Sequence, residues 1–425
     1  MLTRSITLFL LHTILGTTKA APELIPTPTA DETCTLSNNY PTVDETRLPD
    51  PWRFADGKVV ATTGDFTCRQ AEISKILQQY EFGDFPPAPD SVKATWANTT
   101  FVTSNTTTSG GTMTVTVEVN NRTNTFSVNV THPSTRSSST HGSPAIIAYG
   151  GWSIPVPADV GRIIFANDAC AAQTGSGSRG NGWFFHLHGR SHSAGSLLAW
   201  AWCVGRVIDG LEVLGASTTG INPSRLGVTG CSRNAKGAMV AGAFDKRIIL
   251  TIPQESGVGG VACWRMYENE LRRSRQIEPG RRQRISELAS SNTWFSARFN
   301  NFTTSIQKMP ADHHFLPALV APRGLFVVEN NIDWLAPRST TGCMKAGRAI
   351  YNGLGVKSNM GFALHGGHNH CLFPAESEPA LLSFINHFLF GKGAPDDVEV
   401  TPVSINTADW MYRWAAAPNL SLSSP

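Results

Sequence analysis

Residues 225–238 constrain the fold of this chain more than any other stretch, and they read RLGVTGCSRNAKGA. A short apolar run ends at Gly230, Ser232 follows two residues later, and a segment of small residues with helical character begins after it. A sharp strand-to-helix turn of this kind exposes a serine hydroxyl and is the nucleophile elbow of α/β-hydrolases. Asn234 stands in place of the second glycine of the usual G-x-S-x-G pattern. The assignment therefore depends on the strand–turn–helix context, and the alternative is an ordinary tight turn with a surface serine.

The remainder of the chain alternates predicted strands with predicted helices. Apolar runs typical of buried strands occupy residues 145–149, 162–165, 226–229, 248–252 and 325–329. Such alternation predicts an α/β fold, a three-layer sandwich whose largely parallel central sheet carries helices on both faces. Residues 66–82 show helical spacing, and residues 91–133 alternate apolar and polar side chains as an antiparallel hairpin does. We therefore expect a single α/β-hydrolase domain over residues 21–425, with an antiparallel N-terminal edge and an extended arm over residues 21–50.

The first twenty residues are typical of a secretory signal peptide. Arg4 supplies positive charge, residues 6–14 are apolar, and the segment ends in a small residue at Ala20. The apolar run is too short for a membrane anchor, which needs about 20 apolar residues. We expect cleavage after about Ala20, a secreted extracellular protein and no membrane association.

Cysteine content, sequons and charge agree with export. The eight cysteines are even in number and form no C-x-x-C pair, which favours disulfides over zinc ribbons or thioredoxin chemistry. A net charge of +3 is too small for a protein built around nucleic-acid phosphates. Candidate glycosylation sites lie in six N-x-S/T sequons, at Asn98, Asn105, Asn121, Asn129, Asn301 and Asn419.

An elbow serine needs an acid and a histidine, in the chain order Ser, acid, His. Two acids follow predicted strands, Glu255 after residues 248–252 and Asp333 after residues 325–329, and spacing alone leaves both open. The glycine-rich segment 366–374 offers His368 and His370, with His365 just upstream. A three-histidine metal site is the rival interpretation of that cluster, but it lacks an obvious carboxylate or fourth ligand.

Cysteine positions favour one of the two histidines. Cys231 precedes Ser232, and Cys371 follows His370. A disulfide between them would close a long loop, contributing about 4–5 kcal/mol by chain entropy, and would fix nucleophile and base relative to each other. This argument favours His370 over His368 as the base.

Seven motifs in order resemble the fungal glucuronoyl esterases, carbohydrate esterase family fifteen. The resemblance spans about residues 31–415 and rests on residues 229–237 (TGCSRNAKG), 253–257 (PQESG), 263–265 (CWR), 294–296 (WFS), 312–314 (DHH), 330–334 (NNIDW) and 370–371 (HC). It implies hydrolysis of esters between 4-O-methyl-D-glucuronic acid of glucuronoxylan and lignin alcohols, without a cofactor. We expect a monomer whose partners are plant cell-wall glucuronoxylan and lignin–carbohydrate esters.

The resemblance also implies roles for individual residues. Ser232 would be the nucleophile, His370 the general base and acid, and Glu255 the orienting carboxylate, while Arg233 would stabilise the oxyanion. Contacts to the sugar would come from Lys236, Gln283 and Trp334, for which the alternatives are a solvated Lys and Gln and a core Trp. The implied disulfides are Cys34–Cys68, Cys231–Cys371 and Cys263–Cys343, and we expect the remaining Cys170 and Cys203 to pair.

The chain departs from the family pattern in two places. Ala235 replaces a glycine near the elbow, and Ser291 replaces a glutamate three residues before Trp294 that is thought to contact the sugar. An arginine-rich stretch between them is either a solvated basic face or a patch that attracts acidic glucuronoxylan. Its arginines are Arg272, Arg273, Arg275, Arg281, Arg282 and Arg284.

Two other functions compete with this prediction. A different extracellular carbohydrate esterase, such as an acetyl-xylan or feruloyl esterase, would carry the same elbow, although the arginine after the serine and the placement of Cys231 and Cys371 favour the glucuronoyl esterases. A catalytically inactive, carbohydrate-binding homologue is the non-enzymatic alternative. The presence of all three candidate catalytic residues disfavours it.

Overall fold

The computed structural model describes residues 34–103, 106–134, 141–277, 283–420 and 422, so the expected signal peptide lies outside the described residues. Ten strands form one sheet in the order β1-β2-β3-β5-β4-β6-β7-β8-β9-β10. The strands are β1 (Ser91–Thr103), β2 (Thr106–Val119), β3 (Arg122–Thr131), β4 (Ser143–Tyr149), β5 (Gly161–Phe165), β6 (Ile221–Cys231), β7 (Ile248–Gln254), β8 (Gly324–Asn330), β9 (Met360–His365) and β10 (Glu399–Val400).

The α-helices vary from single turns to long rods. They are α1 (Thr63–Leu77), α2 (Asn167–Cys170), α3 (Trp183–His188), α4 (Ser196–Thr219), α5 (Arg233–Phe244), α6 (Trp264–Ile277), α7 (Ile285–Ser291), α8 (Phe315–Val320), α9 (Pro337–Gly353), α10 (Glu378–Phe384) and α11 (Ala408–Met411). None of the helices in the described part of the chain is both long and apolar enough to cross a membrane.

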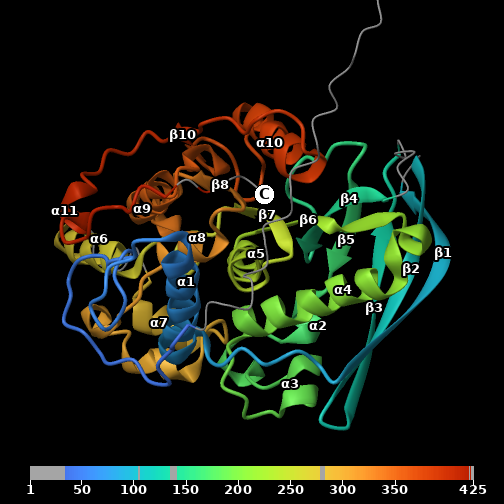
Figure 1. The fold of residues 1–425 in the computed structure, drawn as a ribbon, viewed down its shortest axis with the longest axis horizontal. Helices are drawn as coiled ribbons and strands as arrows, with labels where there is room; N and C mark the ends of the chain where they lie inside the picture. Colours follow the sequence, from blue (N-terminus) through green and yellow to red (C-terminus); the bar gives the residue numbers. More distant parts are fainter. Residues whose placement is uncertain (1–33, 104–105, 135–140, 278–282, 421, 423–425) are drawn as a thin grey trace, which may run out of the picture.

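The predicted antiparallel edge is confirmed. Strands β1, β2 and β3 pair antiparallel, and β3 joins the rest of the sheet by pairing antiparallel with β5. Met113 and Val115 of β2 are buried, while the alternate residues Thr114 and Thr116 bond to Ser127 and Thr125 of β3 on the outer face. Figure 1 shows these long strands at one end of the molecule.

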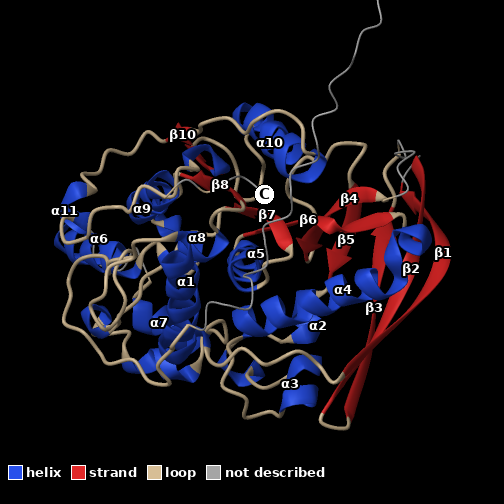
Figure 2. Cartoon of the chain, in the orientation of Figure 1, coloured by secondary structure: helices blue, strands red, loops and turns tan. Residues whose placement is uncertain are grey.

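The predicted three-layer sandwich is also confirmed (Figure 2). Strands β4 to β10 run parallel, and successive side chains of β8 enter two separate cores. Leu325 and Val327 pack in the core with α4, α5, α8 and α9, whereas Phe326 and Val328 pack against α10 and the π-helical turn Ile385–Leu389. The two-residue alternation of a strand thus produces the two helical layers.

The parallel topology determines where functional side chains can meet. Parallel strands β6, β7, β8 and β9 end at the same edge of the sheet, and ligands of open α/β sheets bind outside these carboxyl ends. Ser232 follows β6, Glu255 follows β7, Asp333 lies beyond β8, and His370 lies beyond β9. The fold therefore gathers all the candidate catalytic residues at one edge.

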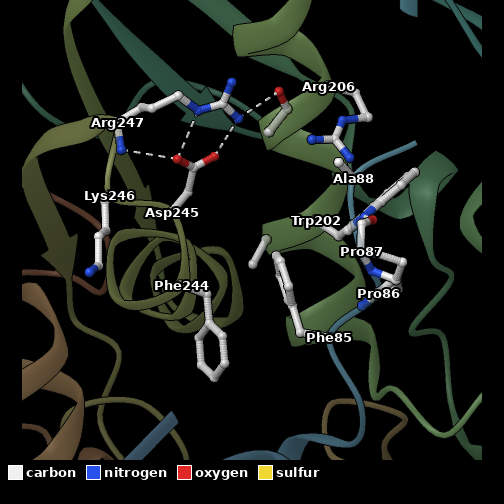
Figure 3. Close-up of a pocket in the computed structure, with 12 residues that line it drawn as sticks. Phe85, Pro86, Pro87, Ala88, Trp202, Arg206, Phe244, Asp245, Lys246 and Arg247 are labelled. Atoms are coloured by element: carbon white, nitrogen blue, oxygen red, sulfur yellow. Dashed lines mark hydrogen bonds and ion pairs between the residues drawn. The ribbon is translucent and has the colours of Figure 1, made fainter. Parts of the chain in front are cut away.

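A hollow of about 240 Å³ lies at the other end of α5 (Figure 3). It is lined by Phe244 and the three residues after it, together with Phe85 and Arg206. Helix α5 begins next to Ser232 and ends at Phe244, so this hollow is separated from the serine by the length of the helix. The guanidinium of Arg247 bonds Asp245 there and is occupied by protein acids.

A buried ion pair between His313 and Glu81 supports the scaffold of the sheet and its helices. His313 Nδ1 lies 2.6 Å from the carbonyl oxygen of Gly260, and His313 Nε2 lies 2.6 Å from Glu81 Oε1. Both neighbours are acceptors when Glu81 is ionised, so the ring carries both protons and pairs as an imidazolium. Burial opposes this charge, but the attraction and hydrogen bond of Glu81, the attraction of Asp312 and the hydrogen bond to Gly260 together outweigh burial and raise the pKa of His313 above 6.5.

This pair predicts a pH dependence of stability. Because the folded-state pKa of His313 is raised, its stabilising contribution is complete below about pH 6.5 and is lost as the pH rises through the folded-state pKa. The substitution His313→Gln should therefore lower Tm by more at about pH 6 than at about pH 9.

The adjacent His314 provides a matched control with the opposite sign. Burial lowers its pKa to about 4, so the wild-type protein loses stability as the pH falls below 6.5. The Tm of His314→Gln, measured relative to that of wild type, should therefore be higher at about pH 5 than above pH 6.5. Equal pH dependence for the two variants would contradict the assigned charge states.

Candidate active site

Ser232 lies at the sharp turn between β6 and α5 and has φ 60° and ψ −126°. A Cβ on Gly230 would lie 2.8 Å from the backbone of Asn234, so the close approach of strand and helix requires glycine there. The Asn234 side chain accepts a hydrogen bond of 3.1 Å from Asn167 and packs beside Gly150. The turn therefore accommodates asparagine in place of the second glycine, because the side chain is directed to the neighbouring loops.

Glu255 follows β7 and is completely buried, with a positive φ of 52°. Its Oε2 lies 2.6 Å from His370 Nδ1 and accepts a second hydrogen bond of 3.1 Å from the backbone N–H of Cys371. This arrangement orients the imidazole and leaves Nε2 for proton transfer. The side chain of His370 is 28% exposed, so the ring bridges a buried acid and the surface.

The disulfide Cys231–Cys371 joins the elbow to the histidine loop, with a Cα–Cα distance of 5.7 Å. A ring nitrogen of His370 lies within 4.8 Å of both sulfurs, and Cys231 directly precedes Ser232. Among the described residues, these three form the cluster whose potential ligand atoms lie close enough together to hold a metal ion. The two sulfurs form a disulfide and are not thiolates, so this group does not have the chemistry of a zinc site.

Both candidate histidines face the same carboxylate. His368 Nδ1 lies 3.6 Å from Glu255 Oε1 and 3.1 Å from Asn330 Nδ2, whereas His370 makes the much shorter contact. Asp333, the alternative acid, lies in the single turn Asp333–Leu335 and is partly exposed. The buried partner of the His370 imidazole is therefore Glu255.

Two of the candidate substrate residues do not have the exposure of their structural alternatives, a solvated lysine and a core tryptophan. Lys236 is not solvated, because it is buried on the first turn of α5, where its ammonium bonds the carbonyl of Ser256 and lies 5.2 Å from the ring of Trp294. Burial lowers the pKa of Lys236 to about 8, against the attraction of Glu329. Trp334 is not in the core, because it is 50% exposed and its ring meets that of His370 edge-on at 4.7 Å.

The remaining candidates lie at the surface. Arg233 is exposed at the start of α5, where unpaired backbone N–H groups and the helix dipole favour negative charge. Gln283 is exposed, and its Nε2 lies 3.4 Å from Ser291 Oγ.

The side chain of Ala235 is fully buried, so its additional methyl group is part of the α5 packing.

The arginine-rich stretch is only partly described. Arg272 pairs with a glutamate of its own helix α6, and Arg284 pairs with a glutamate of α7, the helix that it precedes, which agrees with a solvated basic face. Arg273 lines a hollow of about 260 Å³. Arg281, Arg282 and the side chain of Arg275 lie outside the described residues.

The structure contains four disulfides, and they are the pairs expected from the sequence. They join Cys34 to Cys68, Cys170 to Cys203, Cys231 to Cys371 and Cys263 to Cys343. The first of them fixes the N-terminal arm to α1.

Sequence reasoning did not identify Glu329 as a functional residue. It is the penultimate residue of β8, it is completely buried, and its Oε1 accepts hydrogen bonds from Ser256 and Gly257, directly after Glu255. The available signal was a carboxylate directly after the apolar run of residues 325–328.

The fold and the site define a serine carboxylic ester hydrolase of the α/β-hydrolase type. A sequence profile for fungal glucuronyl esterases matches residues 115–355. A 4-O-methyl-glucuronoyl methylesterase of Thermothelomyces thermophilus is 51% identical over 390 residues, covering 92% of this chain and 93% of the relative. The Neurospora crassa enzyme of the same name is 50% identical over 378 residues, covering 89% of this chain and 91% of the relative.

Solved structures agree with the sequence relatives. A serine-to-alanine variant of the glucuronoyl esterase from Sporotrichum thermophile, in complex with methyl 4-O-methyl-beta-D-glucopyranuronate, superposes with a TM-score of 0.84 at 51% identity, covering 92% of this chain and 100% of that one. A glucuronoyl esterase from Caldicellulosiruptor kristjansonii gives a TM-score of 0.69 at 28% identity, covering 88% and 98%. The chain belongs to the fungal glucuronoyl esterases, carbohydrate esterase family fifteen.

The geometry predicts unequal effects of removing the two acids. Because Glu255 holds His370 Nδ1 from a buried position, Glu255→Ala should lower kcat by roughly three to four orders of magnitude, whereas Asp333→Ala should lower it far less. Steady-state kinetics of both variants, with circular dichroism to verify folding, provide the measurement.

Two results would contradict this assignment. If Asp333→Ala were the more damaging and Glu255→Ala remained close to wild type, the roles would be exchanged. If each variant were mildly impaired and the double variant inactive, the two carboxylates would share the role.

Proposed function

We propose that this enzyme acts outside the cell on plant cell-wall glucuronoxylan and cleaves the esters that join 4-O-methyl-D-glucuronic acid to lignin alcohols. The observation that carries this proposal is the hydrogen bond of 2.6 Å between His370 and the buried Glu255, beside the Ser232 elbow. A relative 51% identical to this chain was crystallised with methyl 4-O-methyl-beta-D-glucopyranuronate, which supports 4-O-methyl-glucuronic acid as the acid part of the substrate ester.

In the proposed reaction, Ser232 Oγ attacks the uronate carbonyl carbon while His370 Nε2 takes the hydroxyl proton. The bond between that carbon and the alcohol oxygen breaks, and the imidazolium returns the proton to the departing alcohol. Water then attacks the acyl-enzyme, its proton passes through His370 to Ser232, and the uronic acid leaves. Glu255 stabilises the imidazolium throughout, and no cofactor takes part.

Arg233 and the N-terminus of α5 would stabilise the oxyanion, since the cation directly follows Ser232 in sequence and the helix that begins there favours negative charge. Lys236 and Gln283 would bond the sugar hydroxyls, and Trp334 would contact the ring. The partly exposed His370 and the half-exposed Trp334 describe an open surface site. Such a site suits a sugar that is one branch of a polymer and an alcohol that belongs to another.

Extracellular action is supported by the four disulfides and the sequence of residues 1–20. The described sequon asparagines are all exposed, as glycan attachment requires, while Asn105 lies outside the described residues. The exposed ones are Asn98, Asn121, Asn129, Asn301 and Asn419. We propose that the mature enzyme works as a monomer.

The test compares two esters and one variant. The wild-type enzyme should hydrolyse benzyl glucuronate with a much higher kcat/KM than p-nitrophenyl acetate, and Ser232→Ala should fold normally but lose several orders of magnitude in kcat. A preference for the acetate, or for a feruloyl ester, would favour the alternative esterases. Retention of more than a tenth of the wild-type kcat by Ser232→Ala would refute the nucleophile assignment.

The departure at Ser291 generates a second prediction. Ser291 lies beside Gln283, so a carboxylate there would add an acceptor for the hydroxyls of an uncharged uronate ester. Ser291→Glu should lower KM for benzyl glucuronate severalfold and leave kcat almost unchanged. The neighbouring exposed Ser290→Glu is the matched control, and an equal decrease in KM for both variants would indicate a general effect of charge.

A further inference from the structure

Glu329 bonds the two residues that follow the candidate acid Glu255, and it is not among the residues expected to contact the substrate. Its Oε1 accepts three hydrogen bonds, from Ser256 N at 2.7 Å, Ser256 Oγ at 3.0 Å and Gly257 N at 3.1 Å. The side chain is completely buried in the described structure. One carboxylate oxygen thus receives both backbone N–H groups that directly follow Glu255.

The segment held in this way is conformationally strained. Glu255 and Gly257 both have positive φ values, 52° and 51°, and a Cβ at position 257 would lie 2.7 Å from Leu335. Non-glycine residues in the left-handed region persist only where the surroundings fix them. The fixing contacts here are the Glu255 N–H to the Val328 carbonyl, at 2.7 Å, and the three bonds to Glu329.

Ser256 also connects this segment to the candidate sugar-binding lysine. Its N–H and hydroxyl donate to Glu329, and its carbonyl accepts from the buried ammonium of Lys236. Helix α5, which carries Lys236, begins immediately after Ser232. The nucleophile helix, the acid loop and β8 therefore meet at a single residue.

The charges at this junction depend on one another. Burial raises the pKa of Glu329 to about 7, and the repulsion of Glu255 adds to this effect, while the hydrogen bonds from Gly257 and Ser256 and the attraction of Lys236 oppose it. Burial lowers the pKa of Lys236 to about 8, and Glu329 opposes that decrease. Each buried charge favours the ionised form of the other.

We propose that Glu329 is a positioning residue, which fixes Ser256 so that Glu255 stays directed at His370 and the ammonium of Lys236 stays directed at the substrate. It acts through these groups and does not touch the substrate. This inference rests on the proposed roles of Glu255 and Lys236, and it assigns them a shared support.

Two substitutions separate the two parts of that role. Glu329→Gln keeps an oxygen facing Ser256 and Gly257 but removes the charge that favours ionised Lys236. Glu329→Asp keeps the charge but withdraws the oxygen by one methylene. The readouts are kcat and KM for benzyl glucuronate as functions of pH, with Tm measured in parallel.

We expect Glu329→Gln to act mainly on KM. Without the neighbouring carboxylate Lys236 loses its proton more easily, so the rise of KM on the alkaline side should begin about one pH unit below that of wild type. Glu329→Asp should keep the wild-type alkaline limb of KM but lower kcat roughly tenfold or more, because the acid is displaced from the histidine.

Glu72→Gln is the matched control. Glu72 is a buried carboxylate of α1 that pairs with Arg69 at 2.5 Å and accepts hydrogen bonds from the N–H of Ala55, so its partners lie in α1 and in the segment before it. Its loss should lower Tm without changing the shape of either pH profile, so it represents a purely structural effect.

Each outcome decides the question. Wild-type kcat and KM profiles for Glu329→Gln, or the same shifts in Glu72→Gln, would overturn the proposal. If Glu329→Gln fails to fold, the aspartate variant decides, and a wild-type kcat for that variant would overturn it. A wild-type enzyme that does not hydrolyse benzyl glucuronate would instead overturn the proposed function, and this inference with it.

Discussion

The hydrogen bond between Glu255 and His370 depends on a topological constraint, namely that parallel strands place their carboxyl ends at one edge of a sheet. The two residues are far apart in sequence, and each follows a different parallel strand, β7 or β9. Ser232 follows β6 at the same edge. Because Glu255 is completely buried and His370 is partly exposed, the pair connects a carboxylate in the interior to an imidazole at the surface.

Local strain accompanies this arrangement. Ser232, Glu255 and Cys371 are non-glycine residues with φ values of 60°, 52° and 68°, and such conformations cost about 1–3 kcal/mol each. The surroundings hold all three: the Cys231–Cys371 disulfide joins two of the turns, and Glu329 bonds the segment after the third. The site is therefore preorganised by the scaffold, as electrostatic stabilisation of a transition state requires.

Local patterns predicted most of the fold, because strand alternation, helical spacing and the elbow are short-range features. The antiparallel edge and the strands up to β8 were predicted in this way, whereas β9 and the two-residue β10 were not. Spacing left Glu255 and Asp333 open, since both follow strands, and only the folded geometry brings Glu255 to His370. The supporting contacts of Glu329 and His313 were not predictable, because each joins residues more than fifty positions apart.

The central claim is that the His370 Nδ1 proton is held by Glu255, and proton NMR tests it most directly. A strongly hydrogen-bonded imidazole proton gives a far-downfield signal, which loss of His370 would identify. The account predicts that this signal is present in the wild-type enzyme, absent from Glu255→Ala and retained in Asp333→Ala. Survival of the signal in Glu255→Ala, or its disappearance in Asp333→Ala, would contradict the account.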